Sequence, residues 1–254
     1  MSTLTSDPRL LYPVSWICES KSVTEYLRKQ FAAQDSEELL IADFASGEND
    51  RIPSFILRVL PDFISNVDFS IRRIITYSTD LHGLRLDSLF GLFQEQHLEG
   101  RARAVHARLE SMVTEASYRL EQAEYLNEHQ QELTILDKRI IEEKGIGEDV
   151  FDLGFLNNDV IGYLFEYYKA YSDALTSLDA VQKTMKPGSL LIVTQPCSLY
   201  PVDNLDVLGR VGFSFIEGID VELDSGEVTL ISDDAELDTL SRIGHYTYLV
   251  LTKA

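Results

Sequence analysis

Two apolar runs in the sequence each end in a carboxylate, a group suited to binding polar ligands. Residues 38–43 end at Asp43, and residues 73–80 end at Asp80. An ionised carboxylate offers two acceptor oxygens to hydroxyl or ammonium groups. The first run continues into the turn Phe-Ala45-Ser46-Gly47, where small side chains let a ligand approach the backbone and glycine adopts positive φ without steric cost. These stretches predict a binding site for a polar small molecule.

The elements that carry these residues form a strand, a loop, a helix and a second strand. Residues 38–43 are typical of a buried parallel strand. Pro53 suits the first turn of a helix, and the apolar positions within 52–60 share one helical face. Residues 73–80 are rich in β-branched and aromatic side chains and predict the next strand. The pattern is that of a β-α-β unit.

The same alternation continues to the end of the chain and predicts an α/β, Rossmann-like fold. Further strands are predicted at 132–137, 150–156, 186–194, 213–221, 227–231 and 245–252, with an apolar helix over about 160–185. We therefore expect a mostly parallel sheet of about seven strands with helices on both faces. Ligands bind beyond the carboxyl ends of the strands in such sheets. Asp137 also ends a predicted strand, so three carboxylates are expected at one edge.

Two segments lie outside this regular pattern. Residues 1–37 predict an N-terminal helical segment, with Ser22 as the residue that caps its main helix, ahead of a domain over 38–254. Within that domain, residues 81–130 form an expected helical insertion, because apolar side chains recur at four- and three-residue steps over 91–127. This stripe allows either a helical cover on the same domain or a homodimer seam or lid.

The stretch from Leu40 to Asn49 resembles the first motif of class I S-adenosylmethionine-dependent methyltransferases, a strand followed by an acid and a turn of small residues. The resemblance implies that the cofactor is S-adenosylmethionine, bound by Asp43, Ala45, Ser46, Gly47 and Asn49. Asn49 stands where the family usually has a second glycine. Asparagine is the next best residue for positive φ, so we expect it to serve the same turn.

The resemblance extends to three later positions and to the order of the elements over 38–254. Asp80 stands where the family places an acid that accepts hydrogen bonds from both ribose hydroxyls. Asp137 matches the position of a polar side chain set against the adenine amino group. Asn157 lies in the loop that follows the fourth core strand and lines the methyl-transfer site. All three are expected to bind the cofactor.

Methyl transfer is the function that this resemblance implies, and the insertion at 81–130 together with the negative charge favours a small-molecule acceptor. The family's amino-group methylases often carry Asn-Pro-Pro-aromatic after the fourth strand, and this chain has Asn157-Asn158-Asp159-Val160. His82, Asn158, Asp159 and Tyr200 follow strand ends, but none is assigned as a catalytic base. A non-catalytic scaffold or regulatory subunit with the same fold remains an alternative. An NAD(P)-dependent oxidoreductase is weaker, because the pattern G-x-G-x-x-G is absent.

Charge and composition narrow the partners and the location. A formal charge of −20 disfavours nucleic acid and anionic membranes as partners. The 44% hydrophobic and 25% charged residues fit an ordinary soluble globular protein. Two cysteines are too few for a disulfide framework, and no Cys/His cluster has the spacing of a zinc site. The sequence shows neither a signal peptide nor a long apolar run, so a cytoplasmic location is expected.

Overall fold

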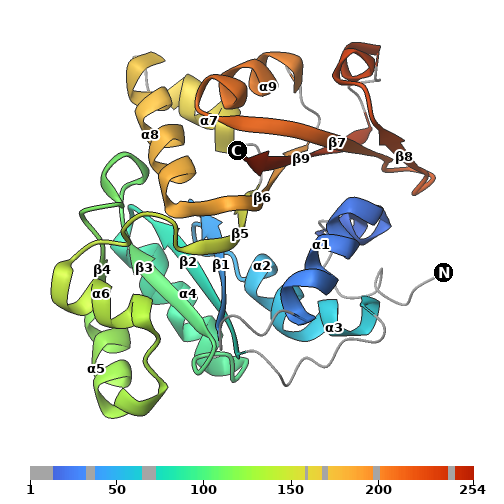
Figure 1. Cartoon of the computed structure of the whole chain (residues 1–254). Coiled ribbons are helices and arrows are strands. Elements are labelled where there is room, and N and C mark those ends of the chain that lie inside the picture. The colour runs from blue at the N-terminus through green and yellow to red at the C-terminus, as the bar shows by residue number, and fades with distance from the viewer. Residues whose placement is uncertain are drawn as a thin grey trace.

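A mixed sheet of nine strands forms the centre of the protein (Figure 1). The computed structural model describes residues 14–32, 38–64, 73–157, 160–167, 171–196, 201–239 and 244–254. The strands are β1 (Glu38–Phe44), β2 (Arg73–Asp80), β3 (Ala102–His106), β4 (Ser117–Tyr118), β5 (Phe151–Leu156), β6 (Met185–Pro196), β7 (Phe213–Glu222), β8 (Val228–Ile231) and β9 (His245–Lys253). Their spatial order is β4-β3-β2-β1-β5-β6-β9-β7-β8.

The direction of the strands explains where a ligand can bind. Strands β3, β2, β1, β5 and β6 pair in parallel, and β9 runs antiparallel to both β6 and β7. The strands that share one direction are therefore β3, β2, β1, β5, β6 and β7, in spatial order. Numbered by their order along the chain, these six strands read 3-2-1-4-5-6. This is the doubly wound order, which reverses between its first and fourth strands. That reversal lies between β1 and β5.

The expectation of seven mostly parallel strands is wrong in number and in direction. Four of the eight neighbouring pairs in the described sheet are antiparallel: β3 with β4, β6 with β9, β7 with β8 and β7 with β9. The three strands after β6 lie side by side. Strand β9 is inserted between β6 and β7 and runs antiparallel to both. The α/β class and the strands at 38–44 and 73–80 are as predicted.

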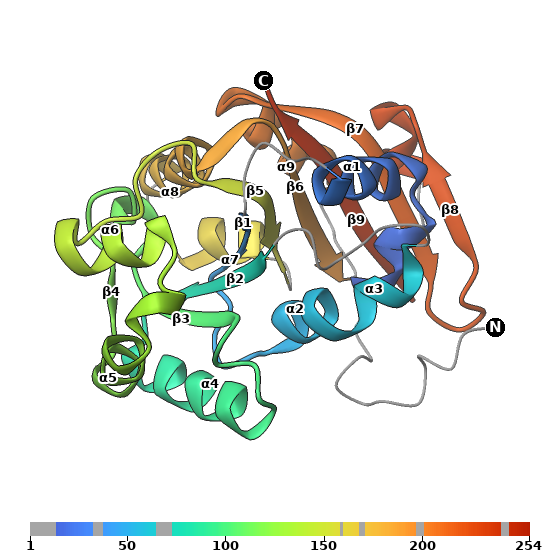
Figure 2. The ribbon, with the colours of Figure 1, turned by 60° about the horizontal axis from the view of Figure 1, so that its bottom comes forward.

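Helices cover both faces of the sheet, as Figures 1 and 2 show. One face packs against α1 (Lys21–Ala32), α2 (Arg51–Ser54), α3 (Leu60–Phe63) and α4 (Gly83–Glu95). The other face packs against α6 (Ile135–Glu143), α7 (Val160–Tyr167), α8 (Tyr171–Thr184) and α9 (Pro201–Arg210). A further helix is α5 (Leu120–Glu128). A π-helical turn (Phe55–Val59) joins α2 to α3, and 3-10 turns lie at Val14–Glu19, Leu109–Ser111, Gln130–Glu132 and Asp234–Thr239.

The N-terminal helix was predicted correctly, but its cap was not. The Ser20 side chain, rather than Ser22, accepts a hydrogen bond of 3.0 Å from the backbone N–H of Val23. Leu27 and Phe31 on α1 belong to the same buried cluster as Leu39 of β1. The boundary between an N-terminal segment and the following domain at residue 37 stays a prediction.

The expected long helix over 91–127 is wrong. This stretch holds the end of α4, strands β3 and β4, a 3-10 turn and most of α5. The apolar stripe misled because Ala102 and Val105 share a four-and-three spacing with flanking loop residues, although both are buried on a short strand. Arg103 between them is buried as well, which hides the strand's apolar character. The helical basis for a dimer seam is therefore missing, and a homodimer remains untested.

The strand predicted at 132–137 is also wrong, because Asp137 lies in the first turn of helix α6. The Thr134 hydroxyl accepts a hydrogen bond of 2.8 Å from the Asp137 N–H, and the Asp137 carboxylate accepts one of 2.9 Å from the Thr134 N–H. This reciprocal pair is a capping box, which marks a helix start.

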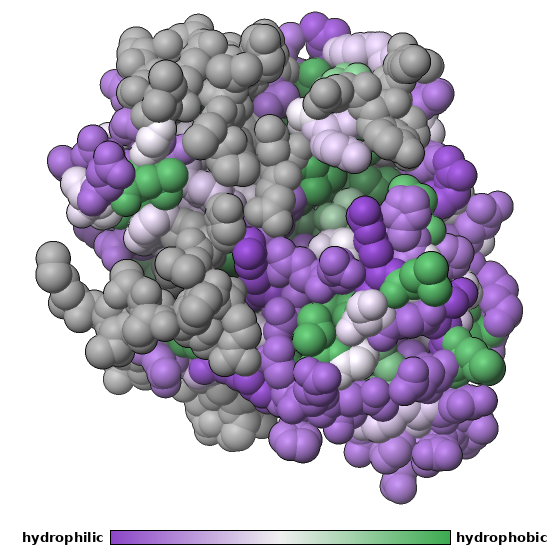
Figure 3. All heavy atoms as spheres, turned by 180° about the vertical axis from the view of Figure 1, so that it is seen from behind, coloured by the Kyte–Doolittle hydropathy of each residue, from purple (hydrophilic) through white to green (hydrophobic). Residues whose placement is uncertain are grey.

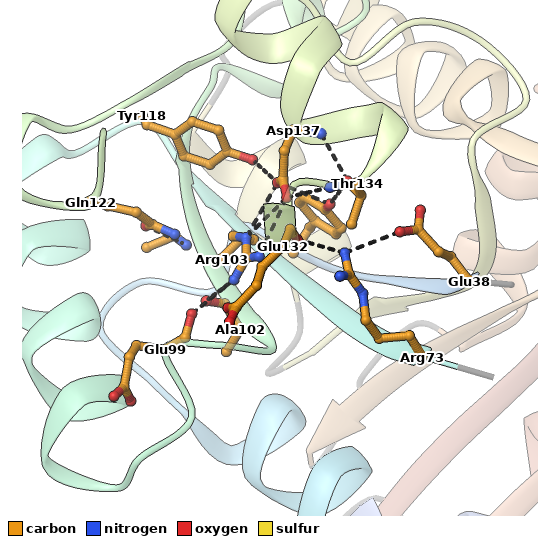
Figure 4. A network of polar contacts seen from close by, with 12 residues as sticks. Glu38, Arg73, Glu99, Ala102, Arg103, Tyr118, Gln122, Glu132, Thr134 and Asp137 are labelled. Atoms are coloured by element: carbon orange, nitrogen blue, oxygen red, sulfur yellow. Dashed lines mark hydrogen bonds and ion pairs between the residues drawn. The ribbon is translucent and has the colours of Figure 1, made fainter. Parts of the chain in front are cut away.

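Asp137 is also the centre of a buried polar network that joins α6 to β2, β3 and β4 (Figure 4). Arg103 donates to both of its carboxylate oxygens at 3.2–3.3 Å, and neither residue is exposed to solvent. The Tyr77 and Tyr118 hydroxyls donate to the same carboxylate at 3.1 and 2.6 Å. Burial, and then the charge of Asp137, raises the pKa of both phenols, so both remain donors. The network is structural.

Breaking this ion pair should strongly destabilise the fold. Arg103→Met leaves the Asp137 carboxylate buried without its cation, which costs about 3–5 kcal/mol of unfolding free energy. The matched control is Arg210→Met, because Arg210 pairs with Asp206 on the surface. That change should cost less than about 1 kcal/mol. Urea unfolding of both variants measures the difference, and equal losses would show that the buried pair adds nothing.

Candidate functional site

A cavity of about 400 Å³ opens where the carboxyl ends of β1, β2, β3 and β5 meet. Its walls come from the last residues of β1 and β2 and from the residues that follow the four strands. It lies at the reversal of strand order between β1 and β5, where doubly wound sheets bind their ligands. Cavities of roughly 300–1,000 Å³ hold small organic ligands. The position and size both fit a small-molecule site.

The loop after β1 forms the first wall. Asp43, Ala45, Ser46 and Asn49 line the cavity, whereas Gly47 shapes the turn without lining it. The positive φ angles in this loop belong to Ala45, at 55°, and Gly47, at 66°. Asn49 does not adopt positive φ; its side-chain oxygen instead accepts a hydrogen bond of 2.9 Å from the backbone N–H of Arg51. The expected role of Asn49 in the turn is therefore wrong, although its place at the cavity is right.

The Asp80 carboxylate ties this loop to the end of β2. One oxygen accepts a hydrogen bond of 3.0 Å from the N–H of Gly47, and the other accepts one of 2.7 Å from the N–H of His82. The N–H of Ser46 donates to the carbonyl oxygen of Thr79 at 2.9 Å. A carboxylate has about four acceptor positions, so each oxygen of Asp80 retains a free lone pair, and the residue lines the cavity. The Asp80 side chain can therefore hold the loop and also accept hydrogen bonds from a ligand.

Asp43 is a buried acid with an unused oxygen. Only 2% of the residue is exposed, and its Oδ1 atom has no hydrogen-bond partner within the described structure. Burial, together with the nearby charge of Asp80, raises the pKa of Asp43 well above its usual range, while the Ser78 hydroxyl opposes that rise. A cationic or hydrogen-bond-donating ligand group would satisfy this carboxyl.

The second and third walls come from the start of α4 and from the loop after β3. Leu81, His82 and Arg85 follow the end of β2, and Ala107 and Leu109 follow β3. Among these residues, only His82 is a candidate from the sequence. Ala107 and Leu109 were missed because β3 itself was read as helix. Leu81 and Leu109 give this part of the cavity an apolar surface.

The fourth wall comes from the end of β5 and from α7. Asn157, Val160, Tyr163 and Leu164 line it. The Thr194 hydroxyl of β6 donates a hydrogen bond of 2.6 Å to the side-chain oxygen of Asn157. This contact fixes the orientation of the amide, because its oxygen faces β6.

The cavity gathers most of the residues predicted for the site and excludes two. Those lining it are Asp43, Ala45, Ser46, Asn49, Asp80 and Asn157. Gly47 shapes the turn beside it, and Asp137 lies in the buried network with Arg103 instead. Asn158, Asp159 and Tyr200 lie outside the described residues. Contact of these side chains with a cofactor stays a prediction.

Two other kinds of site were sought within the described residues. No group of three or more His, Cys, Asp or Glu side chains there could hold a metal ion. None of the described helices has the length and apolar character needed to cross a membrane. On the face seen in Figure 3, the described surface is mainly hydrophilic, and its hydrophobic side chains form separate areas.

Comparison with known proteins gives similarity of fold at low sequence identity. No family profile and no curated protein matches the chain. A TehB-like S-adenosylmethionine-dependent methyltransferase from Corynebacterium glutamicum is 17% identical, with a TM-score of 0.49 over 91% of this chain and 88% of that one. A methyltransferase from Aquifex aeolicus is 10% identical, with a TM-score of 0.45 over 96% of this chain and 95% of that one.

A third similar structure contains a bound ligand. The 1,6-didemethyltoxoflavin-N1-methyltransferase from Burkholderia thailandensis, solved with its substrate and S-adenosylhomocysteine, is 12% identical to this chain. Its TM-score is 0.46, over 92% of this chain and 77% of that one. Many solved structures similar to the chain are S-adenosylmethionine-dependent methyltransferases. At such identities, the function has to be inferred from the cavity of this chain.

The raised pKa of Asp43 predicts a pH-dependent loss of stability. Between the unfolded pKa of about 3.9 and the higher folded pKa, the folded state binds more protons than the unfolded state. The unfolding free energy therefore falls as pH rises, by up to about 1.4 kcal/mol per pH unit from this group. Asp43→Asn should remove this slope, so the variant gains stability relative to the original chain as pH increases.

Urea unfolding at a series of pH values from about 4 to 8 measures this difference. Asp224→Asn is the matched control, because Asp224 is exposed. Its difference from the original chain should not vary with pH. A constant difference for Asp43→Asn as well would refute the raised pKa of Asp43.

Proposed function

We propose that this chain is a cytoplasmic S-adenosylmethionine-dependent methyltransferase that acts on a small molecule. The observation that carries the proposal is the meeting of two carboxylates, Asp43 and Asp80, beside a glycine turn at the reversal of strand order. When bound, S-adenosylmethionine supplies an electrophilic methyl group on a sulfonium cation. A cationic ligand with ribose hydroxyls and an ammonium group matches this pair of acids.

Each wall of the cavity suits a different part of S-adenosylmethionine. Asp80 would accept hydrogen bonds from the ribose hydroxyls through its free lone pairs. The Asp43 carboxyl lines the cavity and suits the ammonium group, and binding would offset the burial of that acid. The apolar surface of Leu81, Ala107 and Leu109 suits an adenine ring. The wall formed by Asn157 and α7 is then left for the methyl acceptor.

The protein would accelerate methyl transfer mainly by positioning the cofactor and the acceptor. Holding cofactor and acceptor together in one cavity removes much of the entropic barrier to their reaction. The turn at Ala45 and Gly47 is fastened by Asp80, so this wall is ordered before ligand binds. The net charge of −20 supports a small molecule over nucleic acid as the acceptor.

The same pair of acids disfavours a nicotinamide dinucleotide. A pyrophosphate carries negative charge and binds where backbone N–H groups are free. The N–H groups of Ser46 and Gly47 are already bonded to Thr79 and Asp80. The charge of Asp80 and the bonded backbone both oppose a pyrophosphate at this turn.

Calorimetry with S-adenosylhomocysteine tests the proposed site. The original chain should bind this compound, and Asp80→Ala should weaken its affinity about 100-fold or more, because the ribose loses a charged acceptor and the loop loses its tie. Asp87→Asn is the control, since Asp87 lies on α4, pairs with Arg119 and does not line the cavity. Its affinity should stay within about twofold.

Two results would contradict the proposal: tighter binding of NADH or NADPH than of S-adenosylhomocysteine, or an unchanged affinity in Asp80→Ala. Transfer of a radiolabelled methyl group from S-adenosylmethionine into small molecules of a cell extract separates an enzyme from a scaffold. A scaffold would bind the cofactor without any transfer.

A further inference from the structure

Asn157 presents a buried hydrogen-bond donor to the acceptor side of the cavity. The residue is 7% exposed and lines the cavity between β5 and α7. Its side-chain oxygen is occupied by the Thr194 hydroxyl at 2.6 Å. Within the described structure, its side-chain nitrogen has no partner. An amide nitrogen can only donate, so the group that completes this site must be a hydrogen-bond acceptor.

The wall of the same cavity at the start of α4 contains a cationic side chain, Arg85. Arg85 and His82 both line the cavity, and neither side chain has an ion-pair or hydrogen-bond partner among the described residues. Arg85 is exposed to solvent at the cavity, yet it has no acidic partner there in a chain with 42 acidic and only 22 basic residues. Arg85 also lies in the first turn of α4, whose N-terminus favours negative charge. These features favour an anion over a neutral or cationic compound.

We infer that the small-molecule acceptor is a carboxylate, whose oxygen accepts a hydrogen bond from the Asn157 side-chain nitrogen and whose charge is attracted by Arg85. This inference rests on the proposed function, because it assigns the second ligand of the same cavity. Val160 and Leu164 supply an apolar wall beside Asn157, so the body of the acceptor is apolar or aromatic. An amine is rejected, because its N–H groups would face the amide nitrogen rather than an acceptor.

Thr194 is the positioning residue of this recognition. Its hydroxyl holds the amide oxygen of Asn157 away from the cavity. Without that hydroxyl, the amide is free to turn and to present its oxygen instead. Thr194 itself is fully buried and does not line the cavity, so it influences a ligand through Asn157 and not by direct contact.

The experiment measures binding by ligand-observed nuclear magnetic resonance to the full chain saturated with S-adenosylhomocysteine. The probes are a panel of small aromatic and aliphatic carboxylates, including benzoate and phenylacetate, each paired with the amine of the same carbon skeleton. Carboxylates should bind at least about tenfold more tightly than their amines. Asn157→Asp should reverse that preference, Arg85→Gln should weaken carboxylate binding about fivefold or more, and Thr194→Val should reduce the discrimination between the two classes.

Asn127→Asp is the control for a change of asparagine to aspartate, because Asn127 is exposed on α5 and outside the cavity. It should leave the preference unchanged. Equal binding of amines and carboxylates, or no carboxylate binding at millimolar concentration, overturns the inference.

A second binding experiment distinguishes whether Asn157 contacts the methyl acceptor or the carboxylate of the cofactor. The affinities of S-adenosylhomocysteine and of 5′-methylthioadenosine, which lacks the amino-acid carboxylate, are measured for the original chain and for Asn157→Asp. Equal effects on both compounds agree with the inference. A loss confined to S-adenosylhomocysteine would mean that Asn157 holds the carboxylate of that compound, which overturns the inference and leaves the proposed function intact. Failure of the original chain to bind either compound would contradict the proposed function itself.

Discussion

The carboxylate of Asp80 is the contact on which the candidate site depends. It lies at the end of one strand and accepts hydrogen bonds from the N–H groups of Gly47 and His82, which belong to two different loops. A charged acceptor forms stronger hydrogen bonds than a neutral one, and here it fixes a turn that includes two residues with positive φ. The turn, the start of α4 and the cavity between them therefore share one anchor, which also retains lone pairs for a ligand.

The two buried acids in this half of the sheet, Asp137 and Asp43, have opposite roles because their surroundings differ. Asp137 is surrounded by Arg103 and two phenols and needs no further partner, so it stabilises the junction of α6 with the sheet. Asp43 is just as buried, yet one of its oxygens has no partner and its pKa is raised by burial. An unsatisfied buried acid in a cavity signals ligand binding, whereas a satisfied one signals structure.

Local patterns predicted β1, β2 and the turn at Gly47, because a buried strand that ends in an acid and small residues is a signal contained within a few positions. Strand β3 was hidden, since the buried Arg103 interrupts its apolar run and its register depends on pairing with β2. The start of α6 could have been found: Thr134 and Asp137 have the spacing of a capping box before an apolar run. Asp137 was misplaced because the start of α6 was predicted as a strand. Ala107 and Leu109 were absent from the predicted site because β3 was predicted as a helix. The cavity's cationic side at Arg85 depends on the packing of α4 beside β2 and has no local sequence signal.

The account's central claim is that the cavity beyond β1 and β2 binds an adenosyl ligand through Asp80. A crystal structure of the protein grown with S-adenosylhomocysteine tests it most directly. We expect density for the compound at the reversal between β1 and β5, with the ribose hydroxyls within hydrogen-bond distance of the Asp80 carboxylate and the ammonium group beside Asp43. Density for the ligand at any other place, with Asp80 still bonded only to Gly47 and His82, would contradict the account.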